Sequence, residues 1–282
     1  MATATPQRSL PYVETWMNFA GEIEGRARVD VPDWSRTNIV LEKHDVRIAD
    51  ARPIRDALSL DREGFTLLDH ASAINADSDL SAEGPDYLRS VAELLQQAVG
   101  ADFVLPQGKG LLKRHAERAN VKGAIGPSRW AHMDYTHYAA RKWVEWIEEW
   151  EDRQLTHYPR FTILQTWRAV SPPPQDNTLV LCDASSIDPK DCITFDAVIR
   201  EPVNEPGNQF ESQLCRYNPA QRWYYFPNMT RDELLVWKGF DSDLAHDAQP
   251  LHNSADIPGL PEEAAPRISI EARFFAFFDS QQ

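Results

Sequence analysis

The stretch FTILQTWR, residues 161–168, decides the class of fold. It is rich in aromatic and β-branched residues, and its side chains would alternate between the two faces of a β-strand. Further short extended runs follow, separated by turn residues at 172–174, 204–207 and 218–219. These runs are residues 178–182, 195–200, 212–217, 223–226, 234–240 and 267–278. Short strands at this spacing predict a sandwich or a closed double-sheet barrel.

Two helices are predicted ahead of or between these strands. From Gly84 to Gly100, apolar residues recur at helical spacing, with Pro85 in the first turn and Gly100 as the stop. A second helix is predicted over residues 137–152, with one apolar stripe formed by Trp143, Ile147 and Trp150. Earlier extended stretches are expected at 38–41 and 46–48. We therefore expect one domain over residues 1–282, in which residues 1–100 form an N-terminal extension with helices packing on the barrel. The barrel core is expected from about residue 100 to residue 282.

The composition excludes several classes of protein. The 282 residues include 43 acidic and 29 basic side chains, for a net charge of -14, which argues against nucleic acid or an anionic membrane as partner. No apolar run approaches the roughly 20 residues of a membrane span. The first twelve residues lack the apolar core of a signal peptide, so we expect a cytoplasmic location. The three cysteines, Cys182, Cys192 and Cys215, lack CxxC spacing and predict neither a disulfide framework nor a thiolate zinc site.

Two triplets place a histidine two residues before an acid: His132-Met133-Asp134 and His115-Ala116-Glu117. On a strand, residues i and i+2 point to the same face, so each triplet can deliver an imidazole and a carboxylate to one point. A third ligand from a later strand would complete a set of two histidines and one carboxylate, which holds Fe(II) and leaves positions open for a co-substrate and O₂. For a lone triplet, a loop histidine with an incidental acidic neighbour is the more common explanation.

Sequence context separates the two triplets. His115 lies in the polar run 113–118, whose cations would repel a metal dication, and a solvated face is expected there. His132 lies among aromatic and small residues in 128–136, which suits a cavity wall. His252 is the candidate third ligand, because the segment 267–273 with its arginines follows it. His246 competes for that role but lacks a downstream arginine at comparable spacing.

The strand predicted over residues 267–278 has one polar face. Arg267, Ser269, Glu271 and Arg273 share that face, while the residues between them are apolar. One interpretation leaves the polar face in water. The other places Arg267 and Ser269 inside the barrel, where the planar guanidinium matches a carboxylate and the hydroxyl adds a donor.

Taken in order, these segments resemble the hydroxylase/desaturase family of Fe(II)/2-oxoglutarate-dependent oxygenases of specialised metabolism. The resemblance covers roughly the last two thirds of the chain, and the order of its motifs is more specific than any one of them. The segments that carry it are 132–136, 166–168, 181–188, 224–230, 237–242, 252–255 and 266–273.

The resemblance implies a mainly β fold with flanking helices, a double-stranded β-helix of the jelly-roll or cupin type. It implies iron at His132, Asp134 and His252, with no catalytic residue beyond the metal centre. It also implies that 2-oxoglutarate is held through its carboxylate by Arg267 with Ser269. Arg273 lies on the same strand face and is the alternative cation.

The implied reaction oxidises an unactivated C–H bond of a small specialised metabolite or amino acid, by hydroxylation, desaturation or oxidative cyclisation. O₂ and 2-oxoglutarate are consumed, and succinate and CO₂ are the co-products. Tyr135, Arg168 and Arg129 are candidate substrate contacts. For Tyr135 a packed core position is the alternative, and for Arg168 a salt bridge to Asp183 or Asp188. The expected partner is a small-molecule substrate, and a homodimer stays open.

Two other functions compete with this interpretation. The first is a non-catalytic barrel protein that binds a small molecule or a metal. The second is a zinc hydrolase that uses the same His/Asp/His set. A hydrolase of this kind would give Arg267 and Ser269 no role. Consumption of 2-oxoglutarate separates the oxygenase from both.

Overall fold

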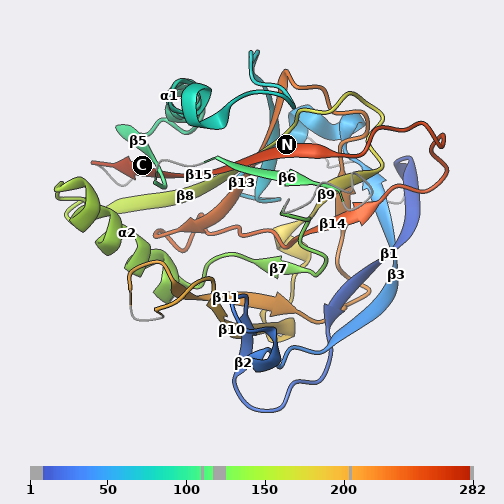
Figure 1. Ribbon diagram of the computed structural model, residues 1–282, viewed down its shortest axis with the longest axis horizontal. Coiled ribbons are helices and arrows are strands. Elements are labelled where there is room, and N and C mark those ends of the chain that lie inside the picture. The colour runs from blue at the N-terminus through green and yellow to red at the C-terminus, as the bar shows by residue number, and fades with distance from the viewer. Residues whose placement is uncertain (1–8, 109–110, 117–124, 203–204, 280–282) are drawn as a thin grey trace.

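The computed structural model describes residues 9–108, 111–116, 125–202 and 205–279, and these residues form two β-sheets. The larger sheet has nine strands (Figure 1). In spatial order they are β1 (Tyr12–Ala20), β3 (Leu41–Asp50), β12 (Trp223–Tyr225), β9 (Asn177–Cys182), β14 (His252–Asp256), β7 (His132–Met133), β11 (Gln209–Cys215), β10 (Cys192–Val198) and β2 (Ala27–Asp30).

The smaller sheet has six strands within the same described ranges. Five of them follow one another as β4 (Phe65–Asp69), β13 (Glu233–Asp241), β8 (Arg160–Ala169), β15 (Ile268–Phe278) and β5 (Phe103–Pro106). The sixth, β6 (Leu112–His115), also pairs with β15. The chain passes from one sheet to the other between β8 and β9 and again between β13, β14 and β15. This alternation between two facing sheets is that of a double-stranded β-helix, or jelly roll, and confirms the predicted fold class.

Strand β8, which contains the stretch 161–168, lies at the centre of the smaller sheet. It pairs antiparallel with β13 on one side and with β15 on the other, and all ten of its residues are buried. A strand buried on both faces requires cover on both sides. The nine-stranded sheet faces one side of β8, and a helix covers the other.

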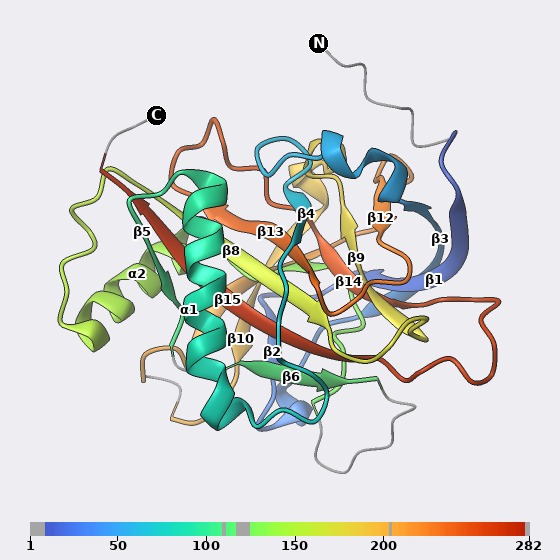
Figure 2. The same ribbon diagram turned by 90° about the horizontal axis from the view of Figure 1, so that it is seen from above.

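Helix α1 (Leu80–Val99) lies across the outer face of the smaller sheet (Figure 2). Its buried residues Tyr87, Leu88, Val91 and Leu95 pack against apolar side chains of β8, β13 and β15. The helix begins four residues before the predicted start, because the Asp79 side chain accepts a hydrogen bond from the Ser81 N–H and caps it there. Pro85 therefore lies inside the helix. The predicted stop at Gly100 is confirmed, with a left-handed φ of 67°.

Helix α2 (His137–Glu151) follows the predicted range and is capped by the Thr136 hydroxyl, which accepts from the Ala139 N–H at 3.0 Å. Trp143 and Ile147 are buried as the stripe predicts. Trp150 differs from the prediction, because it is 49% exposed near the last turn of the helix.

The first 70 residues contribute strands to both sheets. β1, β2 and β3 belong to the nine-stranded sheet and β4 to the smaller one, so the N-terminal part does more than pack helices on the barrel. Of the extended stretch expected at 38–41, only Leu41 belongs to a strand, β3, which also includes residues 46–48. No helix in the described part of the chain combines the length and apolar character that a membrane crossing requires.

The packing of α1 on the sheet predicts a large loss of stability when its core is truncated. Leu95 is fully buried there. Leu95→Ala should lower the free energy of unfolding by about 2–5 kcal/mol, since it removes buried methyl groups and leaves a cavity. Urea denaturation measures this. Gln97→Ala, on the exposed side of the same helix turn, is the matched control and should change stability by no more than about 0.5 kcal/mol.

Candidate metal centre

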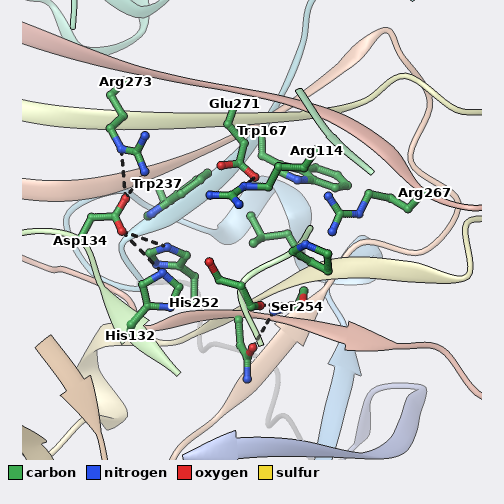
Figure 3. A pocket seen from close by; sticks show the side chains of 14 residues that line it. Arg114, His132, Asp134, Trp167, Trp237, His252, Ser254, Arg267, Glu271 and Arg273 are labelled. Atoms are coloured by element: carbon green, nitrogen blue, oxygen red, sulfur yellow. Dashed lines mark hydrogen bonds and ion pairs between the residues drawn. The ribbon is translucent and has the colours of Figure 1, made fainter. Parts of the chain in front are cut away.

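Three side chains converge between the two sheets: His132 in β7, Asp134 just after it, and His252 at the start of β14 (Figure 3). β7 and β14 are neighbours, and His132 lies directly opposite His252 in the register. Their ligand atoms lie within 4.8 Å of one another, and the ring centroids of the two histidines are 4.1 Å apart. The period of two in the triplet and the pairing of two strands therefore bring together the three residues predicted to bind iron.

The protonation states of this cluster suit a metal ion. His132 Nδ1 lies 2.8 Å from the Trp130 carbonyl oxygen, which can only accept, so Nδ1 carries the proton and Nε2 is free towards the cluster. Burial lowers the pKa of His132 and of His252, so both imidazoles are neutral. Burial alone would raise the pKa of Asp134, but the adjacent Arg273 guanidinium holds it well below its usual range. Two neutral imidazoles and one carboxylate are a donor set that fits Fe(II).

Arg273 of β15 orients the carboxylate of this cluster. Its Nη2 and Nε donate to Asp134 Oδ2 at 2.5 and 3.0 Å, and Nε also donates to Gln165 Oε1 at 3.2 Å. The other oxygen, Oδ1, lies 3.5 Å from His132 Nε2 and 3.9 Å from His252 Nε2. Burial alone would lower the pKa of Arg273, but the Asp134 carboxylate holds the pKa of Arg273 above its usual range. Arg273 is thus committed to Asp134.

Arg267 lies at the other end of the cavity and is 2% exposed. Its guanidinium donates to Ser269 Oγ at 2.5 Å and to Asn177 Oδ1 at 3.0 Å, both neutral acceptors. Its Nε is a buried donor for which the described residues supply no acceptor. Burial lowers the pKa of Arg267 to about 10. A cation buried among neutral partners is unstable and creates a strong local demand for an anion.

A cavity of about 60 Å³ connects Arg267 to the His/Asp/His cluster. Both sheets line it, and Figure 3 shows the two arginines at opposite ends. Two further buried donors in its wall find no acceptor among the residues the structure describes, Trp237 Nε1 and Asn253 Nδ2. The lining residues are Arg114, Pro127, Ser128, His132, Asp134, Trp167, Leu179, Trp237, His252, Asn253, Ser254, Arg267, Glu271 and Arg273.

Arg114 and Glu271 form an ion pair at the cavity wall, with Arg114 Nε 2.8 Å from a carboxylate oxygen. This corrects the expectation of a solvated face around His115. β6 pairs with β15, so Arg114 lies beside Ser269 in the register and is half-buried. The acid of the second triplet, Glu117, lies outside the described residues.

The three predicted substrate contacts do not line the cavity. Tyr135 is 1% exposed in a hydrophobic cluster, and its hydroxyl donates to Gln107 Oε1 at 2.6 Å. Its ring packs beside Gly239, outside the set of residues that line the cavity. Arg129 is bound to Asp256 at 2.9 Å and lies beside, but not in, the cavity wall.

Arg168 lies on the opposite face of β8, under helix α1. Its guanidinium donates to the Tyr87 hydroxyl at 3.0 Å and to the His70 carbonyl, so Arg168 lies away from the cavity and does not form the alternative salt bridge to Asp183 or Asp188. Asp183 instead pairs with Arg222. Arg168 and Gln165 lie three residues apart on one strand, and only Gln165 faces the cavity side.

The sequence reasoning missed Trp167, Trp237 and the Arg114–Glu271 pair as cavity residues. Trp167 could have been found from the sequence, because it lies two residues after Gln165 and a strand places both side chains on one face. Trp237 faces the cavity because β13 pairs with β8 in a register that places Trp237 opposite Gln165. That register is not visible in either strand alone.

Fold and site together define a metal-binding jelly-roll protein whose cavity carries a cationic anchor at its far end. A family model described as "Oxidoreductase/YMDC permease-like domain" matches residues 11–277. The Fe(II)/2-oxoglutarate-dependent dioxygenase NvfI of Aspergillus novofumigatus is 31% identical over 254 residues, 87% of each chain. The gibberellin cluster GA4 desaturase of Gibberella fujikuroi is 26% identical over 83% of this chain and 86% of that protein.

Solved structures agree with these relatives. The iron and alpha-ketoglutarate-dependent endoperoxidase NvfI superposes with a TM-score of 0.80 at 28% identity, covering 95% of this chain and 98% of that one. The chain therefore belongs to this oxidoreductase family and is an Fe(II)/2-oxoglutarate-dependent dioxygenase. The predicted family, fold and use of Fe(II), 2-oxoglutarate and O₂ are confirmed.

The ion pair between Asp134 and Arg273 predicts a test that needs no metal. Asp134→Ala should lower the free energy of unfolding of the metal-free protein by about 3 kcal/mol, because it leaves the Arg273 cation without its carboxylate. The double variant Asp134→Ala/Arg273→Met should recover most of that loss. Equilibrium urea denaturation of the four proteins gives the coupling energy. Additive losses would show that the pair contributes no coupling.

Proposed function

We propose that His132, Asp134 and His252 bind the Fe(II), and that Arg267 with Ser269 binds the distal carboxylate of 2-oxoglutarate. The observation that carries this assignment is the buried Arg267 guanidinium, which has neutral partners and faces the His/Asp/His cluster across one cavity. A dicarboxylate placed between them meets a cation at one end and the metal at the other. When bound, iron with O₂ and 2-oxoglutarate supplies the oxidising power for a C–H bond, with succinate and CO₂ as co-products.

Arg267 suits the carboxylate better than Arg273 does. Arg273 already donates two hydrogen bonds to Asp134, whereas the Arg267 Nε has no acceptor among the residues described. Ser269 holds the guanidinium from one side and Asn177 from the other, which fixes its plane. A fixed fork loses little freedom when it binds a carboxylate.

Other residues of the cavity position the reactants. Arg273 holds Asp134 so that Oδ1 faces the two histidines, which is the usual role of an outer partner of a metal ligand. The Trp237 ring lies 5.2 Å from the His252 ring, so its unsatisfied N–H is at the metal end of the cavity. We assign it as a donor to the keto acid end of 2-oxoglutarate. Trp167, beside Arg267, forms the wall at the opposite end.

The substrate we propose is a small specialised metabolite or amino acid, in keeping with the relatives named for such chemistry. Hydroxylation, desaturation and oxidative cyclisation all begin with removal of a hydrogen from a substrate carbon and differ in the bond that forms next. A cytoplasmic location stays a prediction from the sequence, which made no prediction of the oligomeric state.

The decisive experiment is anaerobic visible spectroscopy of the metal-free protein titrated with Fe(II) and then with 2-oxoglutarate. We expect a metal-to-ligand charge-transfer band that requires both additions. His132→Ala should remove it, because one imidazole is lost. His157→Ala, which changes an exposed histidine, should retain it. A folded, iron-supplied protein without the band would contradict the assignment and favour the non-catalytic barrel.

Arg267→Met should raise the Kd of 2-oxoglutarate by about 100-fold, since a charge-assisted, forked hydrogen bond is lost. Arg267→Lys keeps the charge without the fork and should give an intermediate Kd. Titration of the charge-transfer band measures both values. An unchanged Kd in the methionine variant would move the carboxylate to another cation of the cavity.

Trp237→Phe removes one N–H and keeps an aromatic ring beside His252. We expect the Kd of 2-oxoglutarate to rise about tenfold, as for a single hydrogen bond to a charged acceptor, while the Kd of Fe(II) stays the same. Trp167→Phe, in the same cavity wall, should leave both values within about twofold. If Trp237→Phe weakened Fe(II) binding instead, the indole would support the metal ligands and not the co-substrate.

A further inference from the structure

Two of the three cysteines lie directly opposite each other on neighbouring strands. β10 and β11 pair antiparallel with Cys192 facing Cys215 in the register. The next pair along, Asp191 and Arg216, shares a backbone hydrogen bond of 2.8 Å from the Arg216 N–H to the Asp191 carbonyl. Hydrogen-bonded and non-hydrogen-bonded pairs alternate, so the cysteines occupy a non-hydrogen-bonded pair, in which opposing Cα atoms are about 4.5 Å apart. That separation is within the range of a disulfide.

The two thiols differ in access. Cys192 is partly exposed and borders a surface cavity of about 460 Å³, whereas Cys215 is fully buried. A reagent from solvent therefore meets Cys192 first, and Cys215 stands behind it.

We propose that Cys192 and Cys215 are a thiol–disulfide redox pair that reacts with a small disulfide such as oxidised glutathione. The Cys192 thiolate attacks the small disulfide, forms a mixed disulfide and releases one thiol. Cys215 then attacks the Cys192 sulfur and releases the second thiol. Two protein thiols are oxidised, one small disulfide is reduced to two thiols, and the two thiol protons pass to the leaving thiolates.

The pair is linked to the strand that carries His132. The Cys215 N–H donates to the Ala131 carbonyl at 3.2 Å, and the adjacent Leu214 lies opposite His132. A disulfide holds its Cβ atoms about 3.8 Å apart, closer than the about 4.5–5.5 Å of an ordinary cross-strand pair. Its formation would draw β11 towards β10 and away from β7. We therefore infer that oxidation of the cysteine pair weakens Fe(II) binding. This inference rests on the iron ligands proposed above.

The first test uses the full metal-free chain incubated with oxidised glutathione, alkylated without reduction and digested with trypsin. Cleavage after Arg168, Lys190, Arg200 and Arg216 places each cysteine in a separate peptide. We expect the peptides 191–200 and 201–216 to be linked, and dithiothreitol to separate them. Cys182→Ala is the matched control and should retain the link, while Cys192→Ser and Cys215→Ser should each lose it.

Three results would overturn the redox pair. They are the absence of a linked peptide, a mixed glutathione disulfide that persists at Cys192, or a link from Cys215 to the peptide 169–190 that contains Cys182. None of these readings depends on iron, so the pair can stand or fail separately from the proposed function.

The second test compares Fe(II) affinity of the Cys182→Ala protein in its reduced and oxidised forms. We expect the oxidised form to bind at least about threefold more weakly and reduction to restore the affinity. Equal affinities would overturn the coupling between the cysteines and β7. Failure of both forms to bind Fe(II) would count against the proposed ligands, and the peptide result would be unaffected.

Discussion

The pairing of β7 with β14 is the constraint on which the site depends. β7 has only two residues, and it is held between β14 on one side and β11 on the other. This pairing places His132 opposite His252, and the pleat then brings Asp134 back to the same side. A strand this short has little stability of its own, so the positions of two of the three ligands are set by its neighbours. Residues of β11 do not line the cavity, but they hold the strand of His132 through backbone pairing.

Two of the three arginines that line the cavity are paired with a carboxylate of the protein. Arg273 is paired with Asp134 and Arg114 with Glu271, both within the chain. Arg267 differs because its side-chain partners are neutral. An additional carboxylate from the protein at Arg267 would satisfy the cation and remove its affinity for a ligand. The neutral serine and asparagine keep the guanidinium in place without competing for it.

Much of the site could be predicted from the sequence because it depends on a period of two. His132 with Asp134, and Arg267 with Ser269, are same-face pairs within short segments, and that relation survives any tertiary arrangement. The order of motifs then connected them to one family. The start of α1 was mispredicted because Pro85 is a strong N-terminal signal, whereas the Asp79 cap six residues earlier gains a hydrogen bond from the Ser81 N–H.

What could not be predicted depends on which face of each segment meets the cavity. Arg168 and Tyr135 lie next to cavity residues in the sequence but do not line the cavity. Arg168 packs under α1, and Tyr135 lies in a hydrophobic cluster beside the cavity. Arg114 shows the reverse case, since a run of charges that looks solvated becomes a cavity wall once β6 pairs with β15. These outcomes depend on strand register between distant segments, about which local patterns carry no information.

The burial of Arg267 also explains how a small cavity can favour a dianion. Its pKa of about 10, below the ordinary value of arginine, shows that the folded protein already holds the charged form at a cost in solvation. A carboxylate that enters offsets this cost and meets a guanidinium whose plane is fixed, so little further ordering is required. Folding therefore already places the Arg267 guanidinium in the position and orientation that bind a carboxylate. The same reasoning accounts for a guanidinium at this end of the cavity, since a lysine so deeply buried would shift towards its neutral form and lose the charge that the proposed carboxylate contact requires.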